Sequence, residues 1–395
     1  MKEVPNRTQV VIIGGGPAGS LLSHMLHLEG VESVVLELFS KEHVLGRVRA
    51  GVIEHGSARI LRELGLGDRM DTEGFVHDGV NLAFAGEMLR VDFNALVGKH
   101  VVIYGQTQLQ KDLYDAIEAS GVVFLDESEN ARLRDLDTDT PSVSFERHGE
   151  SHSISCDYVI GCDGARSSTR EYVPTERRRE FERLYPFVWV GVLSPTPPVN
   201  NELIYANHPD GFALCSMRNE NLSRYYVQGA ADDSPEDWPD ERFWAALEAR
   251  LPDGPSRRLV TASTLETIVT PLRSWVMEPM RHERLFLAGD AAHVVPPTGA
   301  KGLNLAISDV VYLARALVEF YDTGSSAGLD GYSDTALDRV WKAVRFSWWM
   351  TQTMHRFPGV SDDFDRRLQE TELHYLFQSE NAQKALAENY VGLPL

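Results

Sequence analysis

A glycine-rich turn near the N-terminus constrains the fold of this chain more than any other feature. Gly14, Gly16 and Gly19 have the spacing GxGxxG and follow directly after the apolar run Gln9–Ile13. The first glycine permits a tight turn, the second lets the backbone approach a pyrophosphate, and the third lets a helix pack closely on the strand. Alone the hexapeptide is a weak signal, because many such matches are ordinary turns.

The residues that follow strengthen this interpretation. Ser20–Leu28 has a helix-forming composition and Gly30 ends it, and Ser33–Leu38 predicts a second buried strand. Glu37, near the end of that strand, is suited to accept hydrogen bonds from a ribose diol, although it could also be a solvated strand end. The helix N-terminus offers unpaired N–H groups to phosphates. The pattern therefore predicts a βαβ unit that binds a dinucleotide.

Two later segments indicate which dinucleotide is bound. Residues 156–170, CDYVIGCDGARSSTR, predict a strand that runs into a turn with Asp163, and residues 285–290, LFLAGD, predict a buried strand that ends at Asp290. A carboxylate at the carboxyl end of such a strand can accept hydrogen bonds from polyol hydroxyls. This favours the ribityl chain of FAD, rather than NAD, in the tightly held cofactor.

The rest of the chain predicts an α/β fold with further parts. Residues 185–228 alternate in polarity and contain prolines, which favours antiparallel sheet, and the pattern becomes helical from Leu303 onward. We expect a Rossmann-like FAD-binding domain over residues 1–180, interleaved with an antiparallel-sheet substrate domain over 181–275. Residues 276–395 are expected to return to the FAD domain and to form a C-terminal helical region.

Composition limits the partners of the chain. It has 38 basic and 58 acidic residues and a net charge of −20, which disfavours binding to nucleic acid. The three cysteines, Cys156, Cys162 and Cys215, form no CxxC pair, so neither a disulfide framework nor a metal site is supported. No run of about 18 apolar residues predicts a transmembrane helix. We therefore expect a cytoplasmic protein that binds neither a metal nor a membrane.

Longer strings, spread over nearly the whole chain, resemble the flavin-dependent aromatic hydroxylases, which are single-component FAD monooxygenases. These strings are LGRVRAGV from Leu45, IYGQT from Ile103, ELIYANHP from Glu202, GFALCS from Gly211, SRYYVQ from Ser223, GDAAHVVPPTGAKGLN from Gly289, RFSWWMT from Arg345 and AENYVGLP from Ala387.

This resemblance implies an enzyme of aromatic compound degradation that hydroxylates 4-hydroxybenzoate at the 3-position to 3,4-dihydroxybenzoate. It also implies non-covalent FAD, O2, NADH or NADPH as co-substrate, a flavin C4a-hydroperoxide, and a homodimer. Two alternatives stay open at this point. One is an FAD-dependent reductase of related fold, and the other is a redox-responsive flavoprotein that binds a partner without turnover.

The resemblance also assigns cofactor contacts. Glu37 would hold the adenosine ribose, Asp290 the ribityl chain, and Arg224 would link the substrate domain to the flavin. A helix that begins near Gly302 would point its positive end at the flavin N1 and C2 carbonyl. The expected cofactor residues are Gly14, Gly16, Gly19, Glu37, Arg47, Arg49, Gln106, Asp163, Arg224, Asp290, Leu303 and Asn304.

Alternation along two predicted strands suggests an anion site. Ser216 and Arg218 face one way, as do Arg224 and Tyr226, because strand side chains alternate with period two. Two arginines on one core-side surface are costly without anions, and a guanidinium binds a carboxylate through two parallel hydrogen bonds. Surface ion pairs are the simpler alternative. The resemblance assigns Arg218, Ser216 and Tyr226 to an aryl-carboxylate clamp.

The resemblance places Tyr205 and Tyr390 at the phenol oxygen of the substrate. They would form a proton relay that exits through His77, whose ordinary pKa near 6.5 permits proton exchange at neutral pH. In isolation each tyrosine could equally be a core aromatic residue, and His77 a turn residue. Pro297 and Thr298 would supply backbone next to the flavin, with the Pro297 carbonyl facing the site of oxygen transfer.

The nicotinamide coenzyme has no second GxGxxG, so we expect it to dock in the cleft between the domains. The resemblance places Arg47, Arg166 and Arg273 there. Leu38 and Phe39, with His43 nearby, stand where NADPH-using members carry polar and basic residues for the 2′-phosphate. Lys41 and Arg47 are nearby and could still bind that phosphate. We nevertheless expect NADH to be used at least as well as NADPH.

Overall fold

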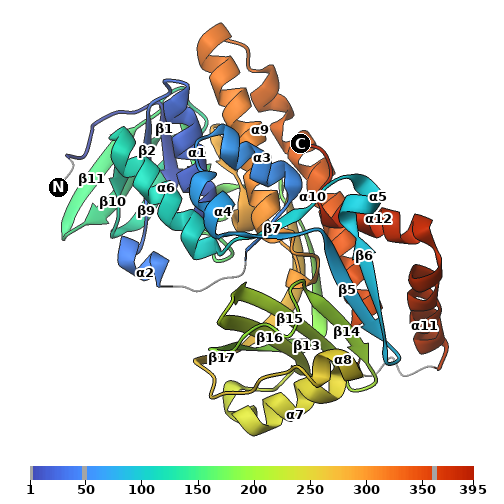
Figure 1. The fold of residues 1–395 in the computed structure, drawn as a ribbon. Coiled ribbons are helices and arrows are strands. Elements are labelled where there is room, and N and C mark those ends of the chain that lie inside the picture. The colour runs from blue at the N-terminus through green and yellow to red at the C-terminus, as the bar shows by residue number, and fades with distance from the viewer. Residues whose placement is uncertain (1–2, 47–50, 358–362) are drawn as a thin grey trace.

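The structure is a computed structural model that describes residues 3–46, 51–357 and 363–395. It has two bodies, one above the other in Figure 1. A mainly parallel six-stranded sheet forms the centre of the upper body, and a mainly antiparallel eight-stranded sheet forms the lower body. This confirms the predicted α/β fold with an antiparallel-sheet unit and a C-terminal helical region.

Short β-branched runs form the middle of the six-stranded sheet. No side chain of Val10–Ile13 (β1) is more than 6% exposed, as expected for a strand covered on both faces. In spatial order the strands are Arg281–His282 (β18), Leu285–Leu287 (β19), Tyr158–Gly161 (β12), β1, Ser33–Leu36 (β2) and Val123–Leu125 (β8). Because β19, β12, β1 and β2 are parallel, their carboxyl ends meet at one edge of the sheet.

The predicted strand, turn, helix and strand at the N-terminus are present. The helix Pro17–Leu28 (α1) begins at Pro17 rather than at Ser20, because proline in the first helical turn gives up no intrahelical hydrogen bond. β2 ends at Leu36, and the chain then turns so that Leu38 and Phe39 are exposed.

Helices surround the six-stranded sheet. α1 packs against both Gln106–Ser120 (α6) and Gly302–Thr323 (α9), and α9 packs against Ala327–Met354 (α10). The other helices are Lys41–Leu45 (α2), His55–Glu63 (α3), Asp68–Glu73 (α4), Phe93–Val97 (α5), Asp240–Arg250 (α7), Asp253–Ser256 (α8), Asp363–Gln378 (α11) and Glu380–Tyr390 (α12). Short 3-10 turns cover Thr169–Tyr172, Pro235–Asp237, Gly289–Ala291 and Pro297–Gly299. No helix in the described part of the chain is long and apolar enough to cross a membrane.

The eight-stranded sheet takes its strands from separate parts of the chain. In spatial order they are His293–Val294 (β20), Glu266–Glu278 (β17), Arg179–Ser194 (β13), Leu222–Ala230 (β16), Gly211–Asn219 (β15), Ile204–His208 (β14), Gly79–Phe84 (β5) and Glu87–Asp92 (β6). β5 pairs in parallel with β14, so residues 79–92 complete a sheet that we expected from residues 181–275. Pairing between such distant segments leaves no local pattern in the sequence. The predicted domain boundaries stay a prediction.

Two small antiparallel sheets complete the strands. One contains Glu150–Ser155 (β11), Ser142–Arg147 (β10) and Ser128–Arg134 (β9), and the other contains Val52–Ile53 (β3), Val101–Ile103 (β7) and Phe75–His77 (β4).

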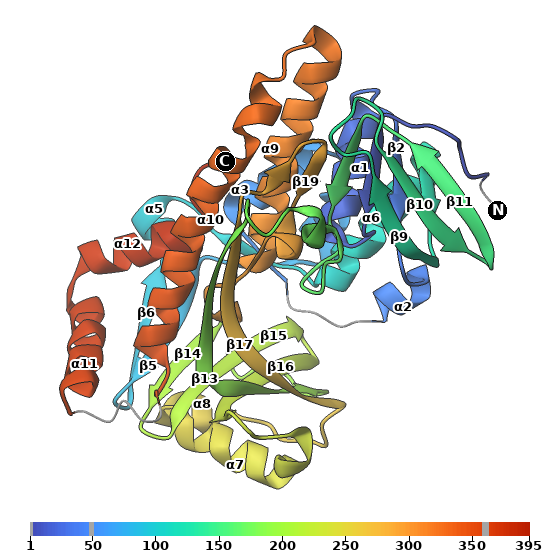
Figure 2. The same ribbon diagram turned by 180° about the vertical axis from the view of Figure 1, so that it is seen from behind.

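α10 and the long strands β13 and β17 connect the two bodies (Figure 2). α10 has 28 residues, which is about 42 Å at 1.5 Å per residue. Near its start, the Tyr332 hydroxyl donates to the Leu287 carbonyl at 2.8 Å. At its end, Asn207 of the lower sheet donates to the carbonyls of Thr353 and Met354 at 3.3 Å. The helix therefore holds the two bodies at a fixed separation.

Candidate active site

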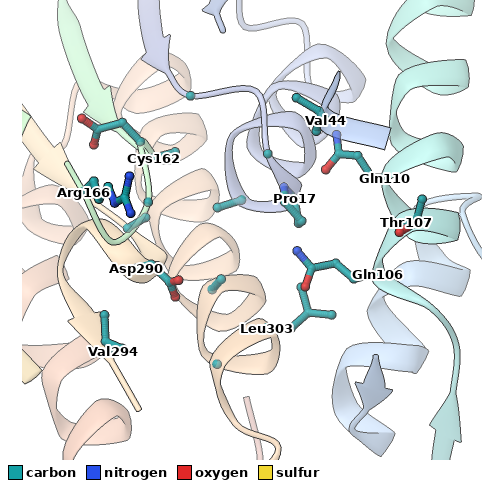
Figure 3. Close-up of a pocket in the computed structure, with 18 of the residues that line it drawn as sticks. Pro17, Val44, Gln106, Thr107, Gln110, Cys162, Arg166, Asp290, Val294 and Leu303 are labelled. Carbon is teal, nitrogen blue, oxygen red and sulfur yellow. The ribbon is translucent and has the colours of Figure 1, made fainter. Parts of the chain in front are cut away.

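A cavity of about 790 Å³ lies between the two bodies. Its upper lining comes from the carboxyl ends of β1, β2 and β12 and from the first turns of α1, α6 and α9, and its lower lining comes from β14, β15 and β16. Figure 3 shows Pro17, Gln106, Asp290 and Leu303 around an open space. The volume lies within the range of ligand and cofactor pockets.

The glycine turn has the shape that a pyrophosphate site requires. Gly14 has a φ of +103°, and a Cβ there would lie 2.3 Å from the Cys162 carbonyl oxygen. A Cβ on Gly19 would lie 2.0 Å from the Gly14 carbonyl oxygen, so only glycine lets α1 pack this closely. At Gly16 a Cβ would meet nothing within 4 Å, and no side chain caps the start of α1. The first turn of α1 is therefore open to an anion.

Glu37 lies at the end of β2, as predicted, and holds the glycine turn. Its two carboxylate oxygens accept hydrogen bonds from the Gly15 N–H at 2.6 Å and from the Phe39 N–H at 2.9 Å. Each oxygen keeps a lone pair that could accept from a ribose hydroxyl. Gln110 and Tyr114 of α6 donate to the Gly15 carbonyl at 3.0 and 3.1 Å. The sequence analysis missed these two residues, because no motif links α6 to the turn.

The two acidic turns differ in what their carboxylates do. Asp163 accepts hydrogen bonds from the Ser168 and Thr169 N–H groups, at 2.7 and 3.0 Å, and from the Thr169 hydroxyl at 2.7 Å. Its carboxylate therefore fixes its own turn. Asp163, Asp290 and Gln106 all line the cavity, and Asp290 and Gln106 face the open space in Figure 3. A contact with a ribityl chain suits Asp290 better than Asp163.

A buried pair that the sequence analysis missed supports the Asp290 turn. Asp309 Oδ2 accepts from the Gly289 N–H at 2.8 Å and lies 2.7 Å from His293 Nε2. Burial lowers the pKa of His293, but the charge and hydrogen bond of Asp309, together with the charge of Asp290, raise it more, so the net pKa lies above its ordinary value. One carboxylate thus ties both ends of the turn that presents Asp290.

The first turn of α9 also enters the cavity. Lys301, Gly302 and Leu303 line it, and no side chain caps the helix. Its free N–H groups and positive end suit the flavin N1 and C2 carbonyl, where negative charge develops on reduction. The Asn304 side chain is buried and bonded to the Val52 carbonyl at 2.8 Å and the Glu54 N–H at 2.9 Å. A cofactor contact from Asn304 would therefore use its backbone. These features of the upper cavity fit FAD.

Arg218 is a partly buried cation in the lower part of the cavity. β15 and β16 pair so that Ser216 lies opposite Arg224. Arg218 Nη1 donates to the Ser216 hydroxyl at 2.7 Å and to the Met217 carbonyl at 3.1 Å, while its Nε has no partner. Burial lowers the pKa of this guanidinium, and the neighbouring Tyr226 opposes that shift. No carboxylate of the described residues forms an ion pair with Arg218.

Arg224, unlike Arg218, forms an ion pair with a carboxylate. Its Nη1 lies 2.5 Å from the Glu266 carboxylate, and the residue is not among those that line the cavity. For Arg224 the simpler alternative, an ordinary ion pair, therefore fits the structure. A contact between Arg224 and the flavin, which the resemblance implied, would have to compete with Glu266.

Tyr205 and Tyr390 meet although 185 residues separate them in the sequence. Their hydroxyl oxygens are 2.9 Å apart, and both side chains are buried. Burial raises the pKa of Tyr205 to about 12 and the pKa of Tyr390 well above its ordinary value. Tyr205 lines the cavity and Tyr390 lies behind it, so the pair forms a hydrogen-bonded path from the cavity into the protein.

His77, the expected exit of this path, is buried on β4. Burial lowers its pKa to about 4, so the ordinary value near 6.5, on which the sequence argument relied, does not apply. Its two ring nitrogens have no hydrogen-bond partner, and no described hydrogen bond joins it to Tyr390. At neutral pH the ring is uncharged and keeps a lone pair that can accept a proton.

α10 supports the turn that carries Pro297. Pro297 lines the cavity at the start of its 3-10 turn. Thr298 is buried, and its hydroxyl lies 3.0 Å from the Thr351 hydroxyl of α10. A substrate contact from Thr298 would therefore come from its backbone.

The expected coenzyme arginines are not all in one place. Arg166 is exposed and lines the cavity. Arg273 does not line it and pairs with Glu182 at 3.6 Å. Arg47 and Arg49 lie outside the described residues.

Leu38 and Phe39 line the rim of the cavity, with exposed fractions of 51% and 37%. The Phe39 ring stacks on His43 at 4.5 Å. This part of the rim is apolar and aromatic, as the sequence indicated.

Trp189 forms an aromatic wall of the cavity that the sequence analysis missed. Its indole N–H donates to His355 Nε2 at 2.7 Å, and the His355 ring stacks with Phe212 at 4.2 Å. Burial lowers the pKa of His355 to about 3, so Nε2 keeps its lone pair for this bond. The pocket therefore has an aromatic wall and a partly buried cation.

Comparison with known proteins shows the family of the chain. Residues 7–347 match a family described as an FAD binding domain. The chain is 48% identical to p-hydroxybenzoate hydroxylase of Acinetobacter baylyi, over 98% of this chain and 96% of that relative. It is 27% identical to a rifampicin monooxygenase of Rhodococcus hoagii, over 82% of this chain and 66% of that relative.

A solved structure extends the comparison of folds. The crystal structure of p-nitrophenol 4-monooxygenase from Pseudomonas putida has a TM-score of 0.82 at 20% identity, over 99% of this chain and all of that one. At this identity the likeness concerns the fold alone.

Proposed function

Because the chain belongs to the family of FAD-dependent aromatic hydroxylases, we propose that its substrate is 4-hydroxybenzoate and its product 3,4-dihydroxybenzoate. The enzyme is a monooxygenase with FAD as cofactor and NAD(P)H as co-substrate. Bound FAD supplies the redox chemistry, in which electrons from NAD(P)H activate O2. The residues of the chain bind and orient the substrate, exclude water and move a proton.

One observation carries the choice of substrate. Arg218 is partly buried, no carboxylate of the described residues pairs with it, and its Nε is buried without a hydrogen-bond partner among those residues. A partly buried cation without a counter-ion is costly. A substrate carboxylate would supply the missing charge and accept hydrogen bonds from Arg218 and the Ser216 hydroxyl.

The opposite end of the substrate meets the tyrosine pair. In our proposal the Tyr205 hydroxyl takes the proton of the substrate phenol as it passes its own proton to Tyr390, and Tyr390 passes its own proton on toward His77, the expected exit of the relay. Negative charge on the phenol oxygen activates the ring carbon next to it, which is the 3-position when the carboxylate is para. Trp189 fixes the ring plane, and the apolar walls exclude water.

The upper cavity supplies the proposed contacts with FAD. Gly14, Gly16 and Gly19 would admit the pyrophosphate, Glu37 the ribose and Asp290 the ribityl chain, while the first turn of α9 would stabilise negative charge on the reduced ring.

We also propose that the chain works as a homodimer in the cytoplasm. Light scattering over a range of protein concentrations would test the dimer.

The test is turnover by the purified FAD-loaded enzyme. NADH and NADPH oxidation would be followed with 4-hydroxybenzoate, 3-hydroxybenzoate, 4-hydroxybenzamide and no substrate, and products would be quantified by chromatography. We expect 4-hydroxybenzoate to stimulate oxidation most and to give 3,4-dihydroxybenzoate that carries one oxygen atom from 18O2. A reduced product that contains no added oxygen would favour a reductase, and flavin reduction without product would favour a redox-responsive binding protein.

A further inference from the structure

A buried lysine fixes the end of α12 next to the tyrosine pair. Lys301 Nζ donates to the carbonyl oxygens of Asn389 at 2.6 Å and Tyr390 at 3.0 Å, and it forms an ion pair with Glu54 at 2.6 Å. Cations satisfy the free carbonyl groups at a helix C-terminus. Lys301 also lines the cavity and precedes α9, so a substitution there would disturb the FAD site directly.

A second buried cation holds the chain just beyond Tyr390 from the other side. Arg339 of α10 donates through Nη1 to the carbonyl oxygens of Leu393 at 2.8 Å and Pro394 at 3.0 Å, and through Nη2 to Glu54 at 3.1 Å. Figure 1 shows this end of the chain, marked C, beside α10. Arg339 is 8% exposed and does not line the cavity.

The segment fits closely around the shared carboxylate. Gly392 has a φ of +97°, and a Cβ there would lie 2.1 Å from Glu54 Oε2. The Val391 carbonyl accepts a hydrogen bond from the His55 N–H at 3.1 Å. Residues 391–394 thus follow a path set by Glu54 and by Arg339.

The charge balance makes this path specific. Two buried cations share a single carboxylate, so the carbonyl groups of residues 389–394 supply the remaining acceptors. A guanidinium offers its N–H groups in a fixed planar fork. Arg339 can therefore contact Glu54 and both carbonyls only when the segment lies in this one arrangement.

We propose that Arg339 is a positioning residue that sets the place of the Tyr390 hydroxyl relative to Tyr205. It touches neither the cavity nor the tyrosine pair, and acts through the backbone that follows Tyr390. The proposal rests on the proposed function, in which the two tyrosines carry the phenol proton. The hydroxyl oxygens of Tyr205 and Tyr390 are 2.9 Å apart. A small shift of α12 would break that hydrogen bond, so the relay depends on where Arg339 holds the chain.

The test uses Arg339→Met and Arg339→Lys in the FAD-loaded enzyme. The ionisation of bound 4-hydroxybenzoate is measured by its phenolate absorbance across pH, in these variants, in Tyr390→Phe, and in the double variant Arg339→Met with Tyr390→Phe. We expect Arg339→Met to raise the apparent pKa of the bound phenol toward the value in Tyr390→Phe, and the double variant to match Tyr390→Phe alone. Tyr332→Phe removes a different hydrogen bond of α10 and should leave the phenol unchanged.

A second measurement does not depend on the substrate. Enzyme that contains 3-fluorotyrosine gives a 19F resonance for residue 390, which is assigned by its loss in Tyr390→Phe. The resonance should move in Arg339→Met and should keep its position in Tyr332→Phe. If Arg339→Met does not fold, Arg339→Lys takes its place, and the resonance should move in that variant. An unmoved resonance, or phenol shifts that add in the double variant, would overturn the proposal. Failure of the unsubstituted enzyme to bind 4-hydroxybenzoate would overturn the proposed function instead.

Discussion

The Arg218→Lys substitution tests how the enzyme binds its substrate. Nη1 of Arg218 is occupied by Ser216 and Met217, which leaves Nε and the rest of the fork for a carboxylate. Lysine keeps the charge but cannot donate two parallel hydrogen bonds. A hydrogen bond to a charged group contributes about 1.5–3 kcal/mol, so the Kd of 4-hydroxybenzoate should rise roughly 10- to 150-fold.

The assay is a titration of the FAD-loaded enzyme, with flavin absorbance as the signal. 4-Hydroxybenzamide has the same shape without the negative charge, so the substitution should weaken its binding far less. Arg250→Lys is the control, because Arg250 is buried outside the cavity and donates to the Ala246 and Asp210 carbonyls. Equal weakening of acid and amide by Arg218→Lys, with FAD retained, would refute the carboxylate clamp.

The other predictions concern FAD, the phenol, the coenzyme and pH. Asp290→Ala should raise the dissociation constant of FAD, and unchanged affinity would mean that the ribityl chain lies elsewhere. Tyr205→Phe should slow hydroxylation or uncouple it from NADH oxidation, with FAD binding intact; an unchanged hydroxylation rate and phenol ionisation would remove it from the relay. With Leu38 and Phe39 at the rim, kcat/KM with NADH should at least equal that with NADPH, and a preference for NADPH of about tenfold, or 1.4 kcal/mol, would contradict this. The pKa of His355, about 3, lies below its unfolded value, so its contribution to stability is complete above pH 6.5 and is lost as pH falls toward 3. His355→Gln should therefore reduce the pH slope of the unfolding free energy by up to about 1.4 kcal/mol per pH unit below pH 6, and urea titrations that show an unchanged slope would contradict it.

Local patterns predicted the upper body well. The β-branched run, the GxGxxG turn and the second strand are neighbours in the chain, so their packing is set by nearby residues. Glu37 and Asp290 also follow from such patterns, because each lies where a buried parallel strand ends. Asp163 has the same position, but Ser168 and Thr169 satisfy its carboxylate within the turn. Composition and spacing alone do not show whether a carboxylate at this position faces the cavity or is bonded within its own turn.

The lower cavity depends on contacts between distant segments. Nothing in the residues around Tyr205 or Tyr390 indicates that they meet, and the expectation came from resemblance alone. Burial then sets properties that a sequence does not display. His77 is buried on β4 and has a pKa of about 4, and Trp189 is oriented by His355, which is 166 residues away in the chain. The site residues that the sequence analysis missed are likewise defined by contacts that local sequence patterns do not show.

The mixed origin of the eight-stranded sheet limits how this enzyme can be recombined with its relatives. β5 and β6 come from residues 79–92, β13 to β16 from 179–230, and β17 from 266–278. An exchange of residues 181–275 alone would bring in a foreign β14 whose edge must pair with the resident β5. A mismatch there would leave unpaired N–H and C=O groups on an open strand edge, which promotes aggregation. Substrate range is therefore easier to change by single substitutions at the cavity than by transfer of a block of sequence.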